Sequence, residues 1–191
     1  MKNLTLLIII STALILTACA PVIVGGAVVS GISVANDRRS AGQVIDDKII
    51  SAQVRKEINN VIHNDEHIKV MTYNGVVLLV GEAETKQDKI KAEDAAAGRN
   101  GVIRVINELH ESFPTGFKRR TKDSYITSKA KSSLLKVKIE GFNATRVRIM
   151  TTRGIVYLMG KVSNIEANAV VDKIRNLRGV AKVVKVFEYI D

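Results

Sequence analysis

The fold is decided by a stretch of sequence that occurs twice: residues 68–81 read IKVMTYNGVVLLVG, and residues 147–160 read VRIMTTRGIVYLMG. In each copy a strand-like run meets an Asn-Gly or Arg-Gly pair, and a second, more apolar run follows and ends in glycine. Two such runs around a two-residue turn are typical of a β-hairpin, in which Gly75 and Gly154 adopt positive φ. We expect Gly81 and Gly160 to end the second strand of each hairpin.

Both hairpins have similar neighbours in the sequence. Before each hairpin, apolar residues recur at helical spacing; they are Ile50, Val54, Ile58 and Val61 in the first copy, and Ile126, Ala130, Leu134 and Val137 in the second. After each hairpin we expect a helix, from Ile90 to about Ala97 and from Ile165 to Leu177, with a glycine beyond its end. A closing strand follows at 102–109 and at 180–189. The order αββαβ, twice, predicts an α+β protein.

The repeat divides the chain into segments. We assign residues 46–112 and 124–191 to two tandem domains, 113–123 to the linker between them, and 19–45 to a flexible tether. A domain of this size has a modest core, which leaves open whether the two domains pack against each other. The alternation of residues 70–73 leaves open whether the second face of each hairpin is buried.

The first residues have the layout of a secretory signal. A short basic start is followed by an apolar run from Leu4 to Leu16. This run has 13 residues, fewer than the roughly 20 that a membrane-spanning helix needs. We therefore assign residues 1–18 to a cleaved signal peptide.

The end of this signal resembles the bacterial lipobox. Leu16-Thr17-Ala18 places an aliphatic residue and two small ones before Cys19, the only cysteine of the chain. The resemblance implies cleavage before Cys19 and covalent lipid, such as palmitate, on that residue. Several acyl chains anchor a protein stably, whereas one binds only reversibly. Because Ala20 stands where an inner-membrane lipoprotein typically has Asp, the resemblance implies the outer membrane, facing the periplasm.

The basic charge of the protein lies in its second half. Residues 46–112 hold 9 Lys/Arg and 12 Asp/Glu, a net charge of −3, whereas residues 117–191 hold 17 and 6, a net charge of +11. A basic surface is typical of proteins that meet nucleic acid, an anionic membrane or an acidic protein. The asymmetry indicates that the two domains face different partners.

One helix face of the second domain suits an anionic membrane. On the side opposite the apolar residues, the helical spacing gathers six residues, namely Tyr125, Lys129, Ser132 and Lys136, flanked by Ser128 and Leu135. A tyrosine ring can lie at headgroup level while lysine ammonium groups meet lipid phosphates. The matching positions of the first domain, Ile49, Gln53, Lys56 and Asn60, form a weaker cationic stripe. The alternative is an ordinary solvated face with Tyr125 packed on a neighbour.

Catalytic and metal-binding patterns are missing from the sequence. It contains no G-x-S-x-G, no P-loop and no H-E-x-x-H. His63 and His67 have a spacing that could hold a metal on a helix, but they fall between a helix and a hairpin, where we expect a solvated loop; His110 is isolated. We predict no catalytic residue, no metal, and no cofactor apart from the lipid on Cys19.

The αββαβ order and the repeat glycines resemble the BON domain, an α+β module of bacterial periplasmic proteins. Two copies behind a lipobox resemble the dual-BON-domain outer-membrane lipoproteins of the DolP (YraP) type, some of which are labelled 21 kDa haemolysin. The resemblance covers the signal and residues 46–191. It implies a protein that is not an enzyme, associates with phospholipid and maintains the integrity of the cell envelope.

These observations predict a binding protein whose second domain contacts anionic phospholipid, while the first domain supports it or docks a protein. The alternative is a structural or interaction protein that uses the same basic surface to dock an acidic envelope protein or assembly factor. Nucleic acid is not its expected partner, because the chain is exported and has few aromatic residues for stacking on bases.

Overall fold

The computed structural model describes residues 23–24, 27–28, 37–62 and 67–190. The chain divides into two compact units, Met1–Ala35 and Asn36–Asp191. In the first unit, strands β1 (Ile23–Val24) and β2 (Ala27–Val28) pair antiparallel within the predicted tether. The predicted signal peptide and Cys19 lie outside the described residues.

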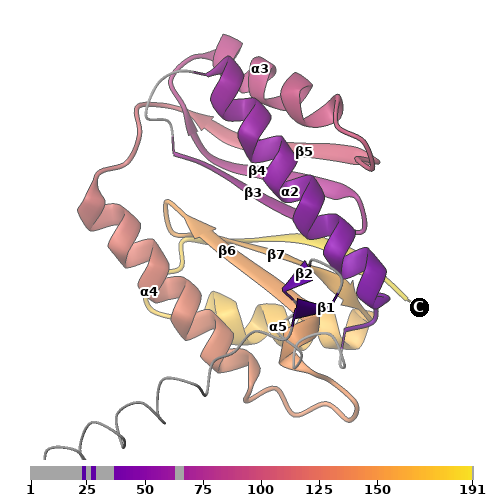
Figure 1. The fold of residues 1–191 in the computed structure, drawn as a ribbon. Helices are drawn as coiled ribbons and strands as arrows, with labels where there is room; N and C mark the ends of the chain where they lie inside the picture. Colours follow the sequence, from indigo (N-terminus) through magenta and orange to yellow (C-terminus); the bar gives the residue numbers. More distant parts are fainter. Residues whose placement is uncertain (1–22, 25–26, 29–36, 63–66, 191) are drawn as a thin grey trace, which may run out of the picture. The chain divides into compact units, whose positions relative to one another are not determined.

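The second unit contains the αββαβ repeat that the sequence predicts (Figure 1). The first domain consists of α2 (Ala41–Val61), β3 (Ile68–Tyr73), β4 (Val76–Ala83), α3 (Lys86–Ala97) and β5 (Arg104–Glu111). The second consists of α4 (Phe117–Leu134), a short 3₁₀ helix η1 (Ala144–Arg146), β6 (Val147–Thr152), β7 (Ile155–Val162), α5 (Asn164–Arg175) and β8 (Lys182–Tyr189). In each sheet the hairpin is antiparallel and its second strand pairs in parallel with the closing strand.

Two boundaries differ from the sequence assignment. Helix α2 begins at Ala41, inside the predicted tether, because the Ser40 side chain caps it by accepting a hydrogen bond from the Gln43 amide. Helix α4 begins at Phe117, inside the predicted linker, with Gly116 at its N-cap. Apart from Phe117, the first two turns of α4 are polar and carry no apolar spacing, so the hydrophobic pattern alone does not reveal them.

The hairpin turns are as predicted, but the glycines after them have another role. Gly75 and Gly154 have φ of 71° and 75°, as a type I′ turn requires. Gly81 and Gly160 lie within β4 and β7 and do not end them. A Cβ at Gly81 would lie 1.9 Å from the carbonyl oxygen of His67, and the φ of Gly81 is +125°. Glycine is therefore needed here for the close approach of the neighbouring strand.

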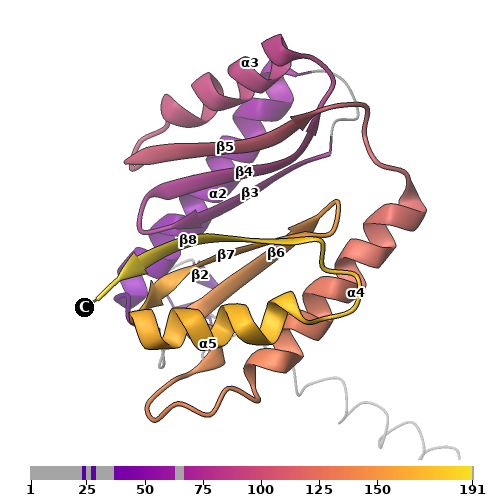
Figure 2. The ribbon, with the colours of Figure 1, turned by 180° about the vertical axis from the view of Figure 1, so that it is seen from behind.

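Each sheet is covered by helices on one face and by the other sheet on its second face. Figures 1 and 2 show α2 and α3 over the outer face of the first sheet, and α4 and α5 over that of the second. The helix-covered cores contain alternate strand residues such as Val77 and Leu79 in the first domain and Val156 and Leu158 in the second. At the end of α2, the predicted core residue Val61 is exposed, and Ile62, which follows the helix, is buried.

The inner faces of the two sheets form a third apolar cluster, which we call the shared layer. Its buried members are Met71, Tyr73, Leu78 and Val80 of the first domain and Tyr157 and Met159 of the second. The Tyr73 hydroxyl also accepts a hydrogen bond from the Lys161 amide, at 3.1 Å. Both faces of each hairpin are therefore buried, and the two domains share part of their core.

The chain enters this unit through a segment that is fixed to both domains. Arg38 forms a bidentate ion pair with Glu166 at the start of α5, at 2.6 and 2.9 Å, and donates to the carbonyl oxygen of Lys161. Arg39 is buried, pairs with Asp37 and Asp47, and lies over the Tyr73 ring, 3.9 Å from its centroid. We call residues 37–39 the entry clasp.

Replacement of Gly81 by Ala should destabilise the protein strongly. The new Cβ would collide with backbone and strain φ, so we expect the free energy of unfolding to fall by about 3 kcal/mol or more. Urea denaturation followed by circular dichroism measures this change. Gly116→Ala is the control, since nothing lies within 4 Å of its Cβ position, and it should cost less than about 1 kcal/mol. If both variants lost a similar free energy of unfolding, the close approach of the neighbouring strand would not be the reason for glycine at position 81.

Acid should weaken the entry clasp through Glu166. Burial opposes ionisation of this carboxyl, but the Arg38 guanidinium, the Ser163 amide and the charge of Arg146 hold its pKa below the ordinary value of 4.5. Because the folded pKa is the lower one, the stabilisation is present above about pH 4.5 and is lost as the pH falls through the folded value.

The variant Glu166→Gln tests this pH dependence. It should lower the free energy of unfolding at pH 7 and flatten its decline in acid, as measured by urea titrations between pH 7 and pH 3. Asp172→Asn, an exposed site on the same helix, should leave the slope unchanged. If the free energy of unfolding of Glu166→Gln falls between pH 7 and pH 3 as steeply as that of the parent protein, the Glu166 carboxyl does not cause the loss of stability in acid.

Candidate functional site

Helix α4, which carries the predicted membrane-binding residues, is fixed to its hairpin by a buried aspartate. The Asp123 carboxylate accepts hydrogen bonds from the amides of Arg153 and Gly154, both at 2.8 Å. Asp47 does the same for the turn amides of Asn74 and Gly75 in the first domain, at 2.8 and 2.9 Å. This pair of aspartates was not predicted, although each stands three residues before a repeated core isoleucine, Ile50 or Ile126.

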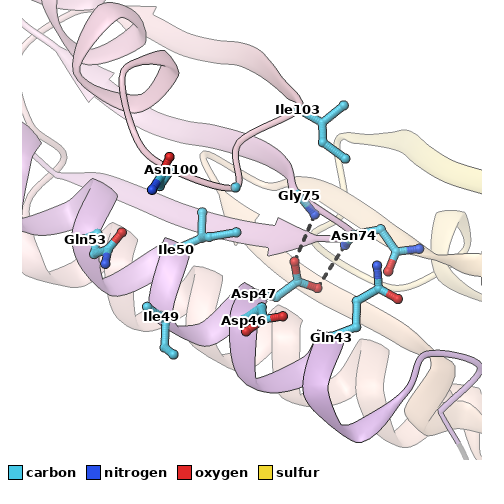
Figure 3. Close-up of a pocket in the computed structure, with 11 residues that line it drawn as sticks. Gln43, Asp46, Asp47, Ile49, Ile50, Gln53, Asn74, Gly75, Asn100 and Ile103 are labelled. Atoms are coloured by element: carbon cyan, nitrogen blue, oxygen red, sulfur yellow. Dashed lines mark hydrogen bonds between the residues drawn. The ribbon is translucent and has the colours of Figure 1, made fainter.

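A hollow lies beside the turn in the first domain. Figure 3 shows the Asp47 carboxylate bonded to the turn amides, next to this hollow of about 390 Å³. Its polar lining consists largely of side-chain amides, contributed by Gln43, Gln53, Asn74 and Asn100, together with Asp46. At the positions of Gln43, Gln53 and Asp46, α4 of the second domain has Arg119, Lys129 and Lys122. The equivalent positions of the second domain, on a helix bonded to its hairpin in the same way, are therefore basic.

The part of α4 that points farthest from the core is uncharged. At about 100° per residue, the direction opposite buried Ile126, Ala130 and Leu134 passes between Thr121 and Ser128. Six residues lie along it, all of them exposed, and we call them the outer ridge: Phe117, Thr121, Tyr125, Ser128, Ser132 and Leu135. The ridge thus has an apolar or aromatic residue at each end and near its middle, with hydroxyl residues between them.

Lysines line one side of this ridge. Lys118, Lys122, Lys129 and Lys136 are all exposed and lie within about 100° of the ridge direction; we call them the lysine row. The Lys129 ammonium group lies 5.2 Å from the centroid of the Tyr125 ring, within the range of a cation–π contact. An anionic surface that approached this strip would meet the cations beside it.

The hydroxyl groups of α4 are bonded to the helix itself. Thr121, Ser124, Ser128 and Ser132 each donate to the carbonyl oxygen four residues earlier, at 3.0 to 3.1 Å. An unpaired hydroxyl is costly to remove from water, whereas a bonded one costs much less. The outer ridge can therefore lose its contact with water at a lower free-energy cost than its polar composition suggests.

A family model described as "BON domain" matches residues 46–111 and 122–191. The chain belongs to the BON-domain family. It is 35% identical to the Outer membrane lipoprotein DolP of Haemophilus influenzae, over 97% of this chain and 96% of the relative. It is 38% identical to the 21 kDa hemolysin of Actinobacillus pleuropneumoniae, over 81% and 79%. Osmotically-inducible protein Y of Escherichia coli is 30% identical, over 71% and 68%. The predicted resemblance is confirmed.

In the second BON domain, all six residues predicted to bind membrane are exposed. Tyr125 is 57% exposed and Leu135 78% exposed, and Ser128, Lys129, Ser132 and Lys136 are exposed as well. The helix ends at Leu134, so Leu135 and Lys136 lie in the turn after it, and the predicted helical residue Val137 lies beyond the helix. Their binding of lipid remains a prediction. Phe117, Thr121 and Lys122 are not among the predicted site residues, because the sequence pattern assigns them to the linker; Lys118 is recognisable in the sequence only as part of the basic run 118–120.

The first BON domain lacks this surface. In α2, the positions that match Lys118, Lys122, Lys129 and Lys136 hold Gly42, Asp46, Gln53 and Asn60. The two helices therefore share their buried face and differ in their exposed one. This difference assigns the basic surface to the second BON domain.

Of the two histidines before the first hairpin, the structure describes only His67, which is partly buried and not fully solvated. His63 lies outside the described residues, but His67 Nδ1 is 3.1 Å from the buried Glu82 carboxylate. Burial opposes ionisation of Glu82, but the hydrogen bond and charge of His67 hold its pKa below the ordinary value. Within the described residues, no three His, Cys, Asp or Glu side chains are grouped to hold a metal. Over the same residues, no helix is long and apolar enough to cross a membrane.

The Asp123 clamp should control the position of α4. We expect Asp123→Ala to leave two buried amides without an acceptor and to lower the free energy of unfolding by about 2–4 kcal/mol. Hydrogen exchange measured by NMR should show faster exchange at the amides of Arg153 and Gly154, while those of Asn74 and Gly75 stay protected by Asp47. Unchanged protection at Arg153 and Gly154 would argue against the clamp.

Proposed function

We propose that this protein is a non-enzymatic lipoprotein, anchored by acylated Cys19 in the outer membrane and facing the periplasm, whose second BON domain binds anionic phospholipid. It thereby supports the integrity of the cell envelope. The name of the DolP relative, an outer membrane lipoprotein, supports the location. The lipobox-like residues before Cys19 support the anchor.

The observation that carries the lipid proposal is the combination of outer ridge and lysine row on α4. Near an anionic membrane each lysine contributes on the order of 1 kcal/mol, and salt screens this attraction. Four such residues beside an uncharged strip supply a useful affinity without a deep binding pocket. Their absence from the matching positions of α2 supports the second domain, and not the first, as the one that binds the membrane.

An acidic envelope protein or assembly factor is the second candidate for this surface. The lysine row and the net charge of +11 in residues 117–191 would attract such a partner as well. Aromatic and aliphatic residues spaced along the outer ridge favour lipid, because an interfacial helix needs apolar anchors beside its charges. Binding to pure lipid vesicles separates the two candidates.

The test uses residues 37–191, which retain the compact unit and the entry clasp. We expect this portion to sediment with vesicles of phosphatidylcholine that contain phosphatidylglycerol or cardiolipin, and not with phosphatidylcholine alone. The double variant Lys129→Glu, Lys136→Glu should bind at least about tenfold more weakly. Binding should also fall with added salt.

The matched control reverses two exposed lysines of the first domain, Lys48→Glu and Lys56→Glu on α2. It changes the net charge by the same amount and should bind like the parent protein. Equal loss in both double variants, or no preference for anionic lipid, would reject the proposal. Deletion of one domain is a poorer test, because it would expose the shared layer to water.

A further inference from the structure

Two phenyl rings stand in solvent where the chain enters the second BON domain. Phe113 is 80% exposed and Phe117 is 85% exposed, and among the described residues these are the most exposed of the large apolar side chains. Neither belongs to the apolar clusters of the two domains or of the shared layer. Two exposed phenyl groups at the start of a helix that also carries a row of cations make this end of α4 a candidate contact surface.

The segment that carries these rings is held in place. The Ser112 amide donates to the carbonyl oxygen of Ala83, at 2.9 Å, which extends the contacts of the first sheet. Three residues later, the Thr115 carbonyl oxygen accepts from Arg120 Nε at 2.7 Å. Pro114 further restricts the backbone between these points. The rings are thus displayed by a fixed segment, which lowers the entropy cost of burying them in a partner.

One of the two rings, Phe117, belongs to the outer ridge, and Phe113 precedes it by four residues. Phe117 is the first residue of the ridge and Leu135 its last, about 27 Å apart at the rise of an α-helix, with Tyr125 between them. Lys118 begins the lysine row directly beside Phe117. Apolar groups therefore occur along the full length of α4, and cations accompany them from one end to the other.

We infer that Phe113 and Phe117 insert into the membrane, so that α4 lies flat on the bilayer over its whole length. This inference rests on the proposed function and deepens it, because it adds Phe113 to the contact and places both rings in the apolar part of the bilayer. The occupant is an anionic bilayer surface, because the lysine row complements its charge and the rings reach its apolar part. Insertion of the rings fixes the rotation and the tilt of the second domain on the membrane.

The chain contains no tryptophan, so a single tryptophan can report on each position separately. We would prepare Phe113→Trp, Phe117→Trp and Leu135→Trp in residues 37–191 and add vesicles of phosphatidylcholine and phosphatidylglycerol. Lipids brominated in their acyl chains quench tryptophan that enters the bilayer. The matched control is Ile103→Trp in the first domain, at a position that is 78% exposed.

The expected result is quenching and a blue shift of the emission for all three α4 reporters, with no change for Ile103→Trp. Quenching of Leu135→Trp without quenching of Phe117→Trp and Phe113→Trp would overturn the inference and leave the proposed function standing. If no variant binds vesicles, both fail. An emission change that depends on protein concentration without lipid would instead identify a second copy of the chain as the partner and overturn the inference.

Substitution of the rings gives an independent measurement. Phe117→Ser should weaken vesicle binding by about tenfold or more, since a buried phenyl group makes a large contribution to partitioning. Unlike Lys129→Glu, it should leave the salt dependence of binding unchanged, because no charge is altered. Unchanged binding of the double variant Phe113→Ser, Phe117→Ser would overturn the inference.

Discussion

The apolar layer between the two sheets joins the two BON domains into one folded unit. Met71, Leu78 and Val80 of the first domain meet Tyr157 and Met159 of the second, and all five are buried. Because each inner sheet face is covered by the other domain, the outward surface consists of the helices and of the exposed positions on β5 and β8. The exposed face of α4 is therefore available for binding, while the inner sheet faces are not.

The local part of the fold could be predicted from the sequence, and the non-local part could not. The hairpins and the αββαβ order follow from spacing and from the Asn74-Gly75 and Arg153-Gly154 turns. Gly81 is required because the backbone of His67 approaches it closely, and the residues that neighbour Gly81 in the sequence do not predict this approach. The shared layer likewise requires the second domain. Of the site, the Tyr125–Lys136 face was predicted and its lipid binding is untested, whereas its start at Phe117 was missed for lack of an apolar repeat.

The two domains share the buried face of their first helix and differ in its exposed face. Asp47 and Asp123 hold the two hairpin turns in the same way, so the buried side of α2 and α4 is constrained equally. The exposed side is free of that constraint. There, Asp46 and Gln53 of α2 occupy the positions that Lys122 and Lys129 occupy in α4. Function can therefore diverge along these helices without a change in the core. The two domains therefore differ in the charge of their exposed helix faces although their topology is the same.

The entry clasp has a consequence for how strong the lipid contact must be. Residues 37–39 fix where the chain joins the folded unit, and the contour of about 18 residues back to Cys19 spans at most about 60 Å. If Cys19 is acylated as proposed, residue 37 never moves farther than that from the bilayer, and α4 stays within this distance plus the length of the folded unit. Its binding then becomes an intramolecular step at an effective lipid concentration in the millimolar range. A weak and rapidly reversible contact is sufficient, so the domain can leave one patch of membrane and settle on another without detaching from the cell envelope.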